Sequence, residues 1–391
     1  MRAGFFLDAY SRRFDVDLVV APVAGSAAMS PFALSRARRI EVLGVDRPES
    51  YYALVSAVRD PLARIEAFRR YGRPSLNAFI APLTRMLRHL AAENYEVLHV
   101  FRLYMAELAT PWIRNGHARP LAVLDCDEDD AMSYRRIAGM ERRRGNWEAA
   151  MWAKAEAEAF ARFAADWLPK FDLVFAASHS ETRSLSVFGV RAMTVPNVAA
   201  ARPVRPRRRG GRCYSIVFVG TMGYAPNVDA VLWFISRVWR RLERALAHRV
   251  RLTIVGGGVG PDIMRLKSQR GIKITGAVGD VGAYYRGADL AIAPLRAGGG
   301  TRIKIIEAAA HGIPVVATGF GAEGTAFRHG ADLLIANHEA GFLRACLLLA
   351  RNRPLAARLA SRARVKVMRG YSPDDWRAFV ADTLAGHKVK S

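Results

Sequence analysis

Short apolar runs alternate with amphipathic stretches of helical period along most of the chain. We predict strands at residues 16–20, 97–101, 121–124, 173–176, 215–219, 250–255, 272–275, 288–295, 314–318 and 333–335. Helices are predicted at 5–13, 51–70 and 76–93, in a long region that ends near Trp167, and from Asn227, Pro261 and Thr301 onward. Alternating strands and helices are typical of parallel, doubly wound sheets, so the sequence predicts an α/β fold.

A segment rich in Pro, Gly and Arg interrupts this alternation. Residues 202–212 read R-P-V-R-P-R-R-R-G-G-R without an apolar period, which indicates a linker. We predict a Rossmann-like domain at 1–199, a linker at 200–213 and a second such domain at 214–371. Residues 372–391 are predicted to form a helix, for which a return to the first domain is one option. Two such domains form a cleft, and ligands bind beyond the carboxyl ends of the strands.

Composition limits the class of protein further. The chain has 391 residues, of which 51% are hydrophobic, and this suits two folded domains rather than a disordered chain. No apolar run reaches the length of about 20 residues that spans a bilayer, and no signal-peptide core is found at the N-terminus. We therefore expect a cytoplasmic protein. Three widely spaced cysteines indicate neither a disulfide framework nor a zinc site.

The positive charge is concentrated in the second half. The formal net charge is +24, of which residues 1–199, with 27 Lys+Arg and 23 Asp+Glu, contribute +4. A basic domain attracts nucleotides, nucleic acid or an anionic membrane. No recognition-helix motif, zinc finger or aromatic-and-basic strand is found, so we expect no nucleic-acid partner.

Residues 293–310, A-P-L-R-A-G-G-G-T-R-I-K-I-I-E-A-A-A, join a predicted strand to a helix through Gly298, Gly299 and Gly300. A helix N-terminus below a glycine loop offers backbone N–H groups to an anion such as phosphate. In a helix from Thr301, the side chains of Thr301, Lys304 and Glu307 lie within about 120° of arc. They suit a diphosphate followed by a ribose, whereas an ordinary turn with a solvated first helical turn is the alternative.

Two further glycine loops follow strands, at Gly220–Gly223 and Gly256–Gly258. The second one suggests a dinucleotide site. However, Pro261 stands where the third glycine of that fingerprint belongs, and no acidic residue follows about twenty positions later. A dehydrogenase is therefore disfavoured.

Several segments together resemble glycosyltransferase family 4. They are F-V-G-T-M-G-Y-A-P-N-V-D-A at 218–230, G-G-G-T-R-I-K-I-I-E-A-A-A-H-G-I-P-V-V-A-T at 298–318, G-A-E-G at 321–324 and V-P-N at 195–197. The resemblance implies a GT-B fold, in which two doubly wound Rossmann-like domains face each other across a cleft. It also implies transfer of a sugar from a nucleotide diphosphate sugar. H-V-F-R-L-Y at 99–104 and the acidic residues at 125–130 are similar to a branch linked to exopolysaccharide biosynthesis.

Site residues follow from the resemblance by position. Glu307 matches the second glutamate of the family's pair, which binds the donor ribose, whereas Gly299 stands where the first is expected. The first loop lacks the family's Arg and Lys, and we expect Arg302 and Lys304 to supply that charge to the diphosphate as catalytic groups. The remaining candidates for donor binding are Gly220, Thr221, Asn227, Gly298, Gly299, Gly300, Thr301 and Glu323.

Candidates on the acceptor side follow two strands of the first half. His99 is a catalytic candidate, with a core histidine as the alternative, and Arg102 is expected to face the acceptor. Asp127 belongs to an acidic loop that either binds a ligand or marks a helix N-terminus. For the basic stretch 135–144 a solvated face is favoured, with contact to anionic lipid as the alternative.

We therefore expect a metal-independent glycosyltransferase without cofactor, with a nucleotide sugar as donor and a glycan or polyprenyl-linked acceptor in surface or exopolysaccharide biosynthesis. The family resemblance favours retention of the anomeric configuration. Peripheral contact with the inner membrane face is compatible with this expectation. The alternative is an inactive nucleotide-sugar-binding protein of the same fold, because Gly299 and the first loop depart from the family pattern. Neither the donor sugar nor the stereochemistry follows from the sequence.

The N-terminus departs from the pattern of a GT-B acceptor domain, which opens with a buried strand. Residues 5–13 instead match the first helix, and 16–20 the second strand. We expect no strand before about Phe14 and a gap in the centre of the first sheet, with an upstream start favoured over a sheet that closes differently.

Overall fold

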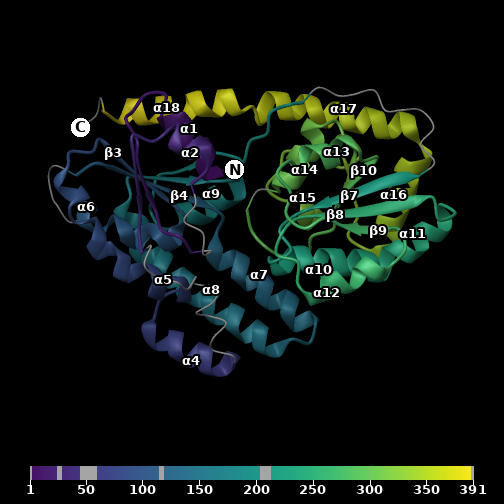
Figure 1. Ribbon diagram of the computed structural model, residues 1–391, viewed down its shortest axis with the longest axis horizontal. Helices are drawn as coiled ribbons and strands as arrows, with labels where there is room; N and C mark the ends of the chain where they lie inside the picture. The colour runs from purple at the N-terminus through teal and green to yellow at the C-terminus, as the bar shows by residue number, and fades with distance from the viewer. Residues whose placement is uncertain are drawn as a thin grey trace. The chain divides into compact units, whose positions relative to one another are not determined.

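The computed structural model describes residues 2–23, 29–44, 60–113, 119–202, 213–300 and 302–388. The chain forms two compact units (Figure 1). Unit 1 contains Met1–Pro196 and Asp374–Ser391, and unit 2 contains Asn197–Pro373. Both are built from parallel strands and helices. Most of the predicted linker lies outside the described residues.

Unit 1 has two parallel sheets, of two and four strands. The first pairs β1 (Asp17–Val20) with β2 (Arg39–Val42), and the second has the order β3 (Val97–Phe101), β4 (Leu121–Asp127), β5 (Leu173–Ala176) and β6 (Ala192–Thr194). Its helices are α1 (Arg2–Tyr10), α2 (Pro31–Leu34), α4 (Pro61–Tyr71), α5 (Ser75–Ile80), α6 (Thr110–Ile113), α7 (Asp130–Arg143), α8 (Trp147–Trp167), α9 (His179–Ser186) and α18 (Pro373–Lys388).

Within the described residues, the prediction of an initial helix with no strand before about Phe14 is confirmed. Helix α1 begins at Arg2, and the first strand is β1 at Asp17. Leu98 of β3 and Val19 of β1 pack into one apolar cluster, although the two strands belong to different sheets. The strands of unit 1 thus form two separate sheets, as expected from the predicted gap in the centre of the first sheet.

Unit 2 has one six-stranded parallel sheet, with the order β12-β11-β10-β7-β8-β9. The strands are β7 (Tyr214–Val219), β8 (Val250–Val255), β9 (Ile272–Ile274), β10 (Leu290–Ala293), β11 (Val315–Ala317) and β12 (Leu334–Ile335). The helices are α10 (Ala225–Phe234), α11 (Arg240–Ala245), α12 (Pro261–Met264), α13 (Gly282–Arg286), α14 (Ile303–Ala310), α15 (Gly319–Ala322), α16 (Glu339–Arg351) and α17 (Arg353–Gly370). Apolar clusters on both faces bury the sheet, as expected for a doubly wound domain.

Three local predictions are wrong. The helix predicted at 76–93 is broken after α5 into two 3₁₀ segments, the first of which carries Pro82 near its start. The long helix that was expected to end near Trp167 is divided at Gly145, whose φ of 76° ends α7. Helix α14 begins at Ile303 instead of Thr301, which itself lies outside the described residues.

Candidate functional site

The candidate donor site of unit 2 lies at the carboxyl ends of β7 and β10. Strand β7 ends at Val219, and Gly220 opens the loop that leads to α10. A Cβ on Gly220 would lie 2.8 Å from Nδ2 of Asn227, so this glycine allows the Asn227 side chain to lie against the loop. The Nδ2 group of Asn227 donates to the carbonyl of Thr221 at 2.9 Å. This bond turns Oδ1 of Asn227 away from the loop carbonyl.

Lys304 occupies the first turn of α14 and connects the two loops. Its Nζ donates to Oδ1 of Asn227 at 2.6 Å and lies 4.6 Å from the centre of the Phe218 ring. Burial, together with the nearby Arg302, lowers the pKa of Lys304 to about 7. The first loop contains no Arg or Lys of its own. Lys304 therefore brings an ammonium from α14 to the start of α10.

Glu307 lies one turn further along α14. The hydroxyl of Tyr285 donates to Oε2 of Glu307 and to the carbonyl of Lys304, both at 3.2 Å. Burial raises the pKa of Glu307, although the Tyr285 hydroxyl and Lys304 oppose this shift. Tyr285 was not among the sequence candidates, because its position in a short helix gives no signal of a contact across the unit.

Arg302 shapes the glycine loop. Its side chain is 5% exposed, and its guanidinium donates to the carbonyls of Gly299 and Phe320 and approaches Oε2 of Glu323 at 3.7 Å. These contacts tie the loop to α15. They direct Arg302 donors to backbone oxygens, so its catalytic role and the sugar contact of Glu323 stay predictions.

The glycines of this region fit close backbone approaches. Gly298 has a φ of 106°, and a Cβ there would lie 2.7 Å from the Tyr224 hydroxyl. Gly300 has a φ of 72°. A Cβ on Gly256 would lie 2.0 Å from the Gly220 carbonyl oxygen. The Gly256 loop thus packs against the first loop, which is a structural reason for its glycines.

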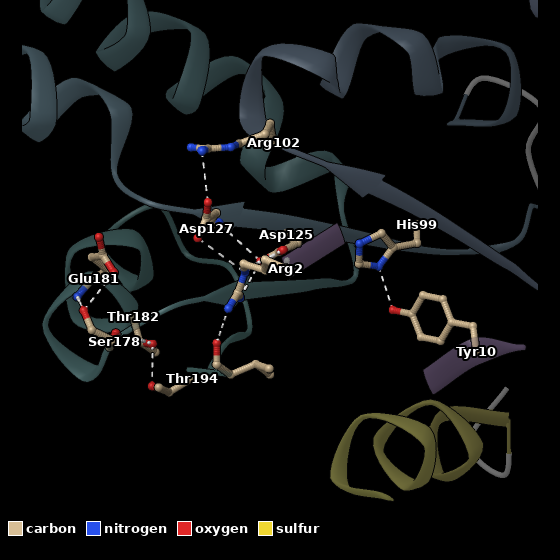
Figure 2. A network of polar contacts seen from close by, with 11 residues as sticks. Arg2, Tyr10, His99, Arg102, Asp125, Asp127, Ser178, Glu181, Thr182 and Thr194 are labelled. Carbon is tan, nitrogen blue, oxygen red and sulfur yellow. Dashed lines mark hydrogen bonds and ion pairs between the residues drawn. The ribbon is translucent and has the colours of Figure 1, made fainter. Parts of the chain in front are cut away.

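Unit 1 holds a second polar cluster, at the carboxyl ends of β3 and β4 (Figure 2). The guanidinium of Arg102 pairs with Asp127 at 3.0 Å and with Glu128 at 2.9 Å. Arg102 and Asp127 have φ values of 80° and 56°, in the region that favours glycine. Strained residues at strand ends often belong to functional sites. The structure therefore brings together Arg102 and Asp127, the two predicted acceptor residues.

The acidic segment was predicted to follow a strand, and this is wrong for its first part. Strand β4 extends through Asp127, with an irregular register against β5 between Asp125 and Asp127. The reason is Arg2, whose Nε and Nη2 donate to the Asp125 carboxylate at 2.8 and 2.6 Å, while Nη1 donates to the Val195 carbonyl (Figure 2). A neutralised carboxylate can remain in a buried strand. No local pattern points to Arg2, because it lies 123 residues away from Asp125 along the chain.

His99 lies in an aromatic cluster. Its ring centre is 4.7 Å from that of Phe6, and its Nδ1 is 2.6 Å from the Tyr10 hydroxyl (Figure 2). Burial lowers the pKa of His99 to about 3, so the ring is neutral at physiological pH. This packing favours the core alternative over the predicted catalytic role, which stays a prediction.

Within the described residues, no group of three or more His, Cys, Asp and Glu side chains is arranged to hold a metal ion. Across the same residues, no helix is long and apolar enough to cross a bilayer.

Residues 213–352 match the model of the family described as glycosyl transferases group 1. A relative from Klebsiella pneumoniae, described as an uncharacterized 44.6 kDa protein in the cps region, is 27% identical over 146 residues. The match covers 35% of this chain and 37% of that relative, so it spans little more than a third of the relative's length.

Solved structures resemble the whole chain. Sucrose-phosphate synthase from Thermosynechococcus elongatus has a TM-score of 0.68 at 14% identity, covering 100% of this chain and 92% of that one. Anabaena HepE in complex with UDP and glucose has a TM-score of 0.60 at 15% identity, covering 98% and 94%. These likenesses confirm the GT-B fold, and the family match agrees with the predicted resemblance to glycosyltransferases.

Proposed function

We propose that this chain, whose residues 213–352 form a group 1 glycosyltransferase domain within a GT-B fold, transfers a sugar from a nucleoside diphosphate sugar to an acceptor hydroxyl. The observation that carries the proposal is the pair of side chains on α14. Lys304 presents an ammonium at the start of α10, and Glu307 presents a carboxylate one turn away. An ammonium can pair with a diphosphate, and a carboxylate one turn away can accept hydrogen bonds from a ribose.

The donor reacts by loss of its nucleoside diphosphate. As the bond between the sugar and the diphosphate breaks, negative charge grows on the leaving phosphate oxygen. The Lys304 ammonium stabilises that charge, together with backbone N–H groups of the glycine loop. Glu307 accepts hydrogen bonds from the ribose hydroxyls, replacing its bond from Tyr285 or sharing it. The acceptor hydroxyl forms the new bond to the sugar and gives its proton to the departing nucleoside diphosphate.

The ammonium of Lys304 supplies the charge for which other transferases use a divalent cation, so we propose a metal-independent reaction. Family resemblance favours retention of the anomeric configuration. UDP is bound in the HepE structure, and a uridine nucleotide is therefore the first donor to test.

The acceptor is proposed to bind the polar cluster of unit 1. Carboxylates and guanidinium groups such as those of Asp127 and Arg102 form hydrogen bonds with sugar hydroxyls. The Klebsiella relative in a cps region supports a surface glycan or a lipid-linked glycan as the acceptor. A lipid-linked acceptor places the enzyme at the inner membrane face.

A thermal-shift screen with UDP-, GDP- and ADP-sugars tests donor binding. A donor at 100 times its dissociation constant stabilises the folded chain by about 2.7 kcal/mol. Release of nucleoside diphosphate with an extract of lipid-linked glycans then tests turnover. No stabilisation by any donor contradicts the proposal. If a donor stabilises the chain but no nucleoside diphosphate is released, the alternative of an inactive nucleotide-sugar-binding protein is supported. Gly299 and the absence of Arg and Lys from the first loop are the features that favour this alternative.

A further inference from the structure

Helix α17 carries a charge that the donor site does not use. Its sequence, RPLAARLASRARVKVMRG, contains six basic residues and no acidic one. Inside unit 2 its apolar side, with Leu359, Ala363 and Val367, is buried in contact with α14. The helix is thus anchored to the domain by one side only.

The outer side of α17 combines cationic and apolar side chains. At 100° per residue, Arg358, Arg362 and Arg369 fall within about 40° of arc. Val365 and Met368 lie beside this stripe and are 43% and 51% exposed. This face therefore combines positive charge with two exposed apolar side chains, the two features that an anionic lipid surface can bind.

The three arginines are available for a partner. No ion pair within the described residues involves Arg358, Arg362 or Arg369, whereas Lys366 of the same helix pairs with Asp332. Ionic neutralisation inside the domain therefore does not account for the outer stripe.

The neighbouring helix also exposes basic and apolar side chains. Helix α16 contacts α17, and both lie at the same end of unit 2 (Figure 1). Arg344, Leu348 and Arg351 recur on one face of α16 at helical spacing, and Leu348 is 45% exposed. Positive charge and exposed aliphatic side chains thus occur on two adjacent helices.

We propose that the outer face of α17, defined by Arg358, Arg362, Val365, Met368 and Arg369, docks on an anionic lipid surface. The arginines bind lipid phosphates, and the two apolar side chains enter the boundary between head groups and acyl chains. A nucleic acid also attracts arginines. However, it has no use for exposed aliphatic side chains, and this face has no aromatic ring on which a base could stack.

The test compares variants of the full chain by co-sedimentation with vesicles. One set of vesicles is pure phosphatidylcholine and the other contains phosphatidylglycerol. The R358Q/R362Q/R369Q variant removes the α17 stripe, and R135Q/R142Q/R143Q removes the same charge from α7. A V365S/M368S variant removes the apolar part alone. Melting curves by circular dichroism check that each variant is folded, and retention on a single-stranded oligonucleotide provides a second readout.

We expect the parent chain to sediment with anionic vesicles and not with neutral ones. The α17 arginine variant should lose about a hundredfold in partitioning, because three basic residues leave the charged surface. The α7 variant should remain within about threefold of the parent, and V365S/M368S should lose about tenfold. Full binding by the α17 variant, or equal losses in both arginine variants, would overturn the proposal. The proposal would also be overturned if V365S/M368S bound vesicles as the parent does and the α17 arginine variant lost its retention on the oligonucleotide. That result would assign the arginines to nucleic acid. Since no donor is present, the outcome is independent of the proposed sugar transfer.

Discussion

The ammonium of Lys304 lies 2.6 Å from the side-chain oxygen of Asn227 and thereby joins the helices that follow two different strands. The amide of Asn227 cannot rotate freely, because its nitrogen donates to the Thr221 carbonyl. Asn227 therefore holds the Lys304 ammonium beside the first loop, which has no cationic side chain of its own.

We expect Lys304→Met to weaken binding of a nucleoside diphosphate by about 1.5–3 kcal/mol, the contribution of a hydrogen bond to a charged group. Affinity for the nucleoside alone should remain unchanged, since it has no diphosphate. Isothermal titration calorimetry measures both ligands. Lys273→Met, at an exposed position, serves as the matched control, and equal losses for both ligands would exclude a diphosphate role.

Donor binding should depend on pH through the same side chain. The pKa of Lys304 is lowered from 10.5 to about 7, so above pH 7 the empty site holds a neutral amine. A bound diphosphate restores the charged form, so binding takes up a proton and weakens as the pH rises from 7 toward 10. A nucleotide sugar is the suitable ligand, because it lacks the terminal phosphate that titrates near 6. Calorimetry in buffers of different ionisation enthalpy should detect this proton uptake. If the Lys304→Met variant took up the same proton on binding, the uptake would belong to another group.

The same shift affects folding in the opposite direction. Between pH 7 and 10.5 the unfolded chain binds more protons at Lys304 than the folded chain, so this residue makes the free energy of unfolding rise with pH. Urea unfolding at pH 7 and 9 should show a smaller increase for Lys304→Met than for the parent chain. An unchanged increase contradicts the assignment.

Glu307→Gln should weaken donor binding or turnover by about 1.5–3 kcal/mol, because a neutral amide is a poorer acceptor for ribose hydroxyls. The hydrogen bond from Tyr285 survives in this variant, so the fold is retained. Comparison of ribose and 2′-deoxyribose nucleotides is the informative measurement. If Glu307 binds the ribose, the variant discriminates less between them, and Glu339→Gln discriminates as the parent does.

Arg2→Met should lower the free energy of unfolding by about 3–5 kcal/mol, because it leaves the buried Asp125 carboxylate without its partner. The double variant Arg2→Met with Asp125→Leu removes both charges and should recover much of that loss. Chemical denaturation of the three proteins forms the test. Additive losses in the double variant would show that the pair is not coupled.

Glu156 should make unit 1 more stable in acid. Burial raises its pKa from 4.5 to about 7, against the opposing bond from the Ser75 N–H group. The folded chain therefore holds a proton that the unfolded chain releases, and the free energy of unfolding falls as the pH rises from 4.5 to 7. In Glu156→Gln this fall should be smaller by a few kcal/mol, on the order of 1.4 per pKa unit. If urea titrations gave the same change in the free energy of unfolding with pH for the parent and for Glu156→Gln, the prediction for Glu156 would be wrong.

Strands were predictable where burial is continuous. Residues 97–101, 173–176 and 250–255 match β3, β5 and β8 because runs of apolar residues leave few alternatives. Strand β2 was missed, because Arg39 and Glu41 interrupt its apolar pattern at an exposed edge. The extension of β4 depends on a partner that is 123 residues away in sequence, and a local pattern cannot contain it.

The candidate site shows the same division. Spacing along one helix was enough to place Lys304 and Glu307 on neighbouring turns. The contacts with Asn227 and Tyr285 depend on how separate strands pair, and only the folded sheet defines them.

The division of unit 1 into two chain segments has a consequence for biosynthesis. Helix α18 completes this unit through the ion pair of Arg377 with Asp8 at 2.7 Å, yet it is translated after all of unit 2. Unit 2 is continuous, so its last residue is synthesised before α18, the last helix of unit 1. At about 5–20 residues per second, Asp8 waits on the order of 20–70 seconds for its partner. During synthesis the order of domain completion is therefore expected to be the reverse of the order along the chain.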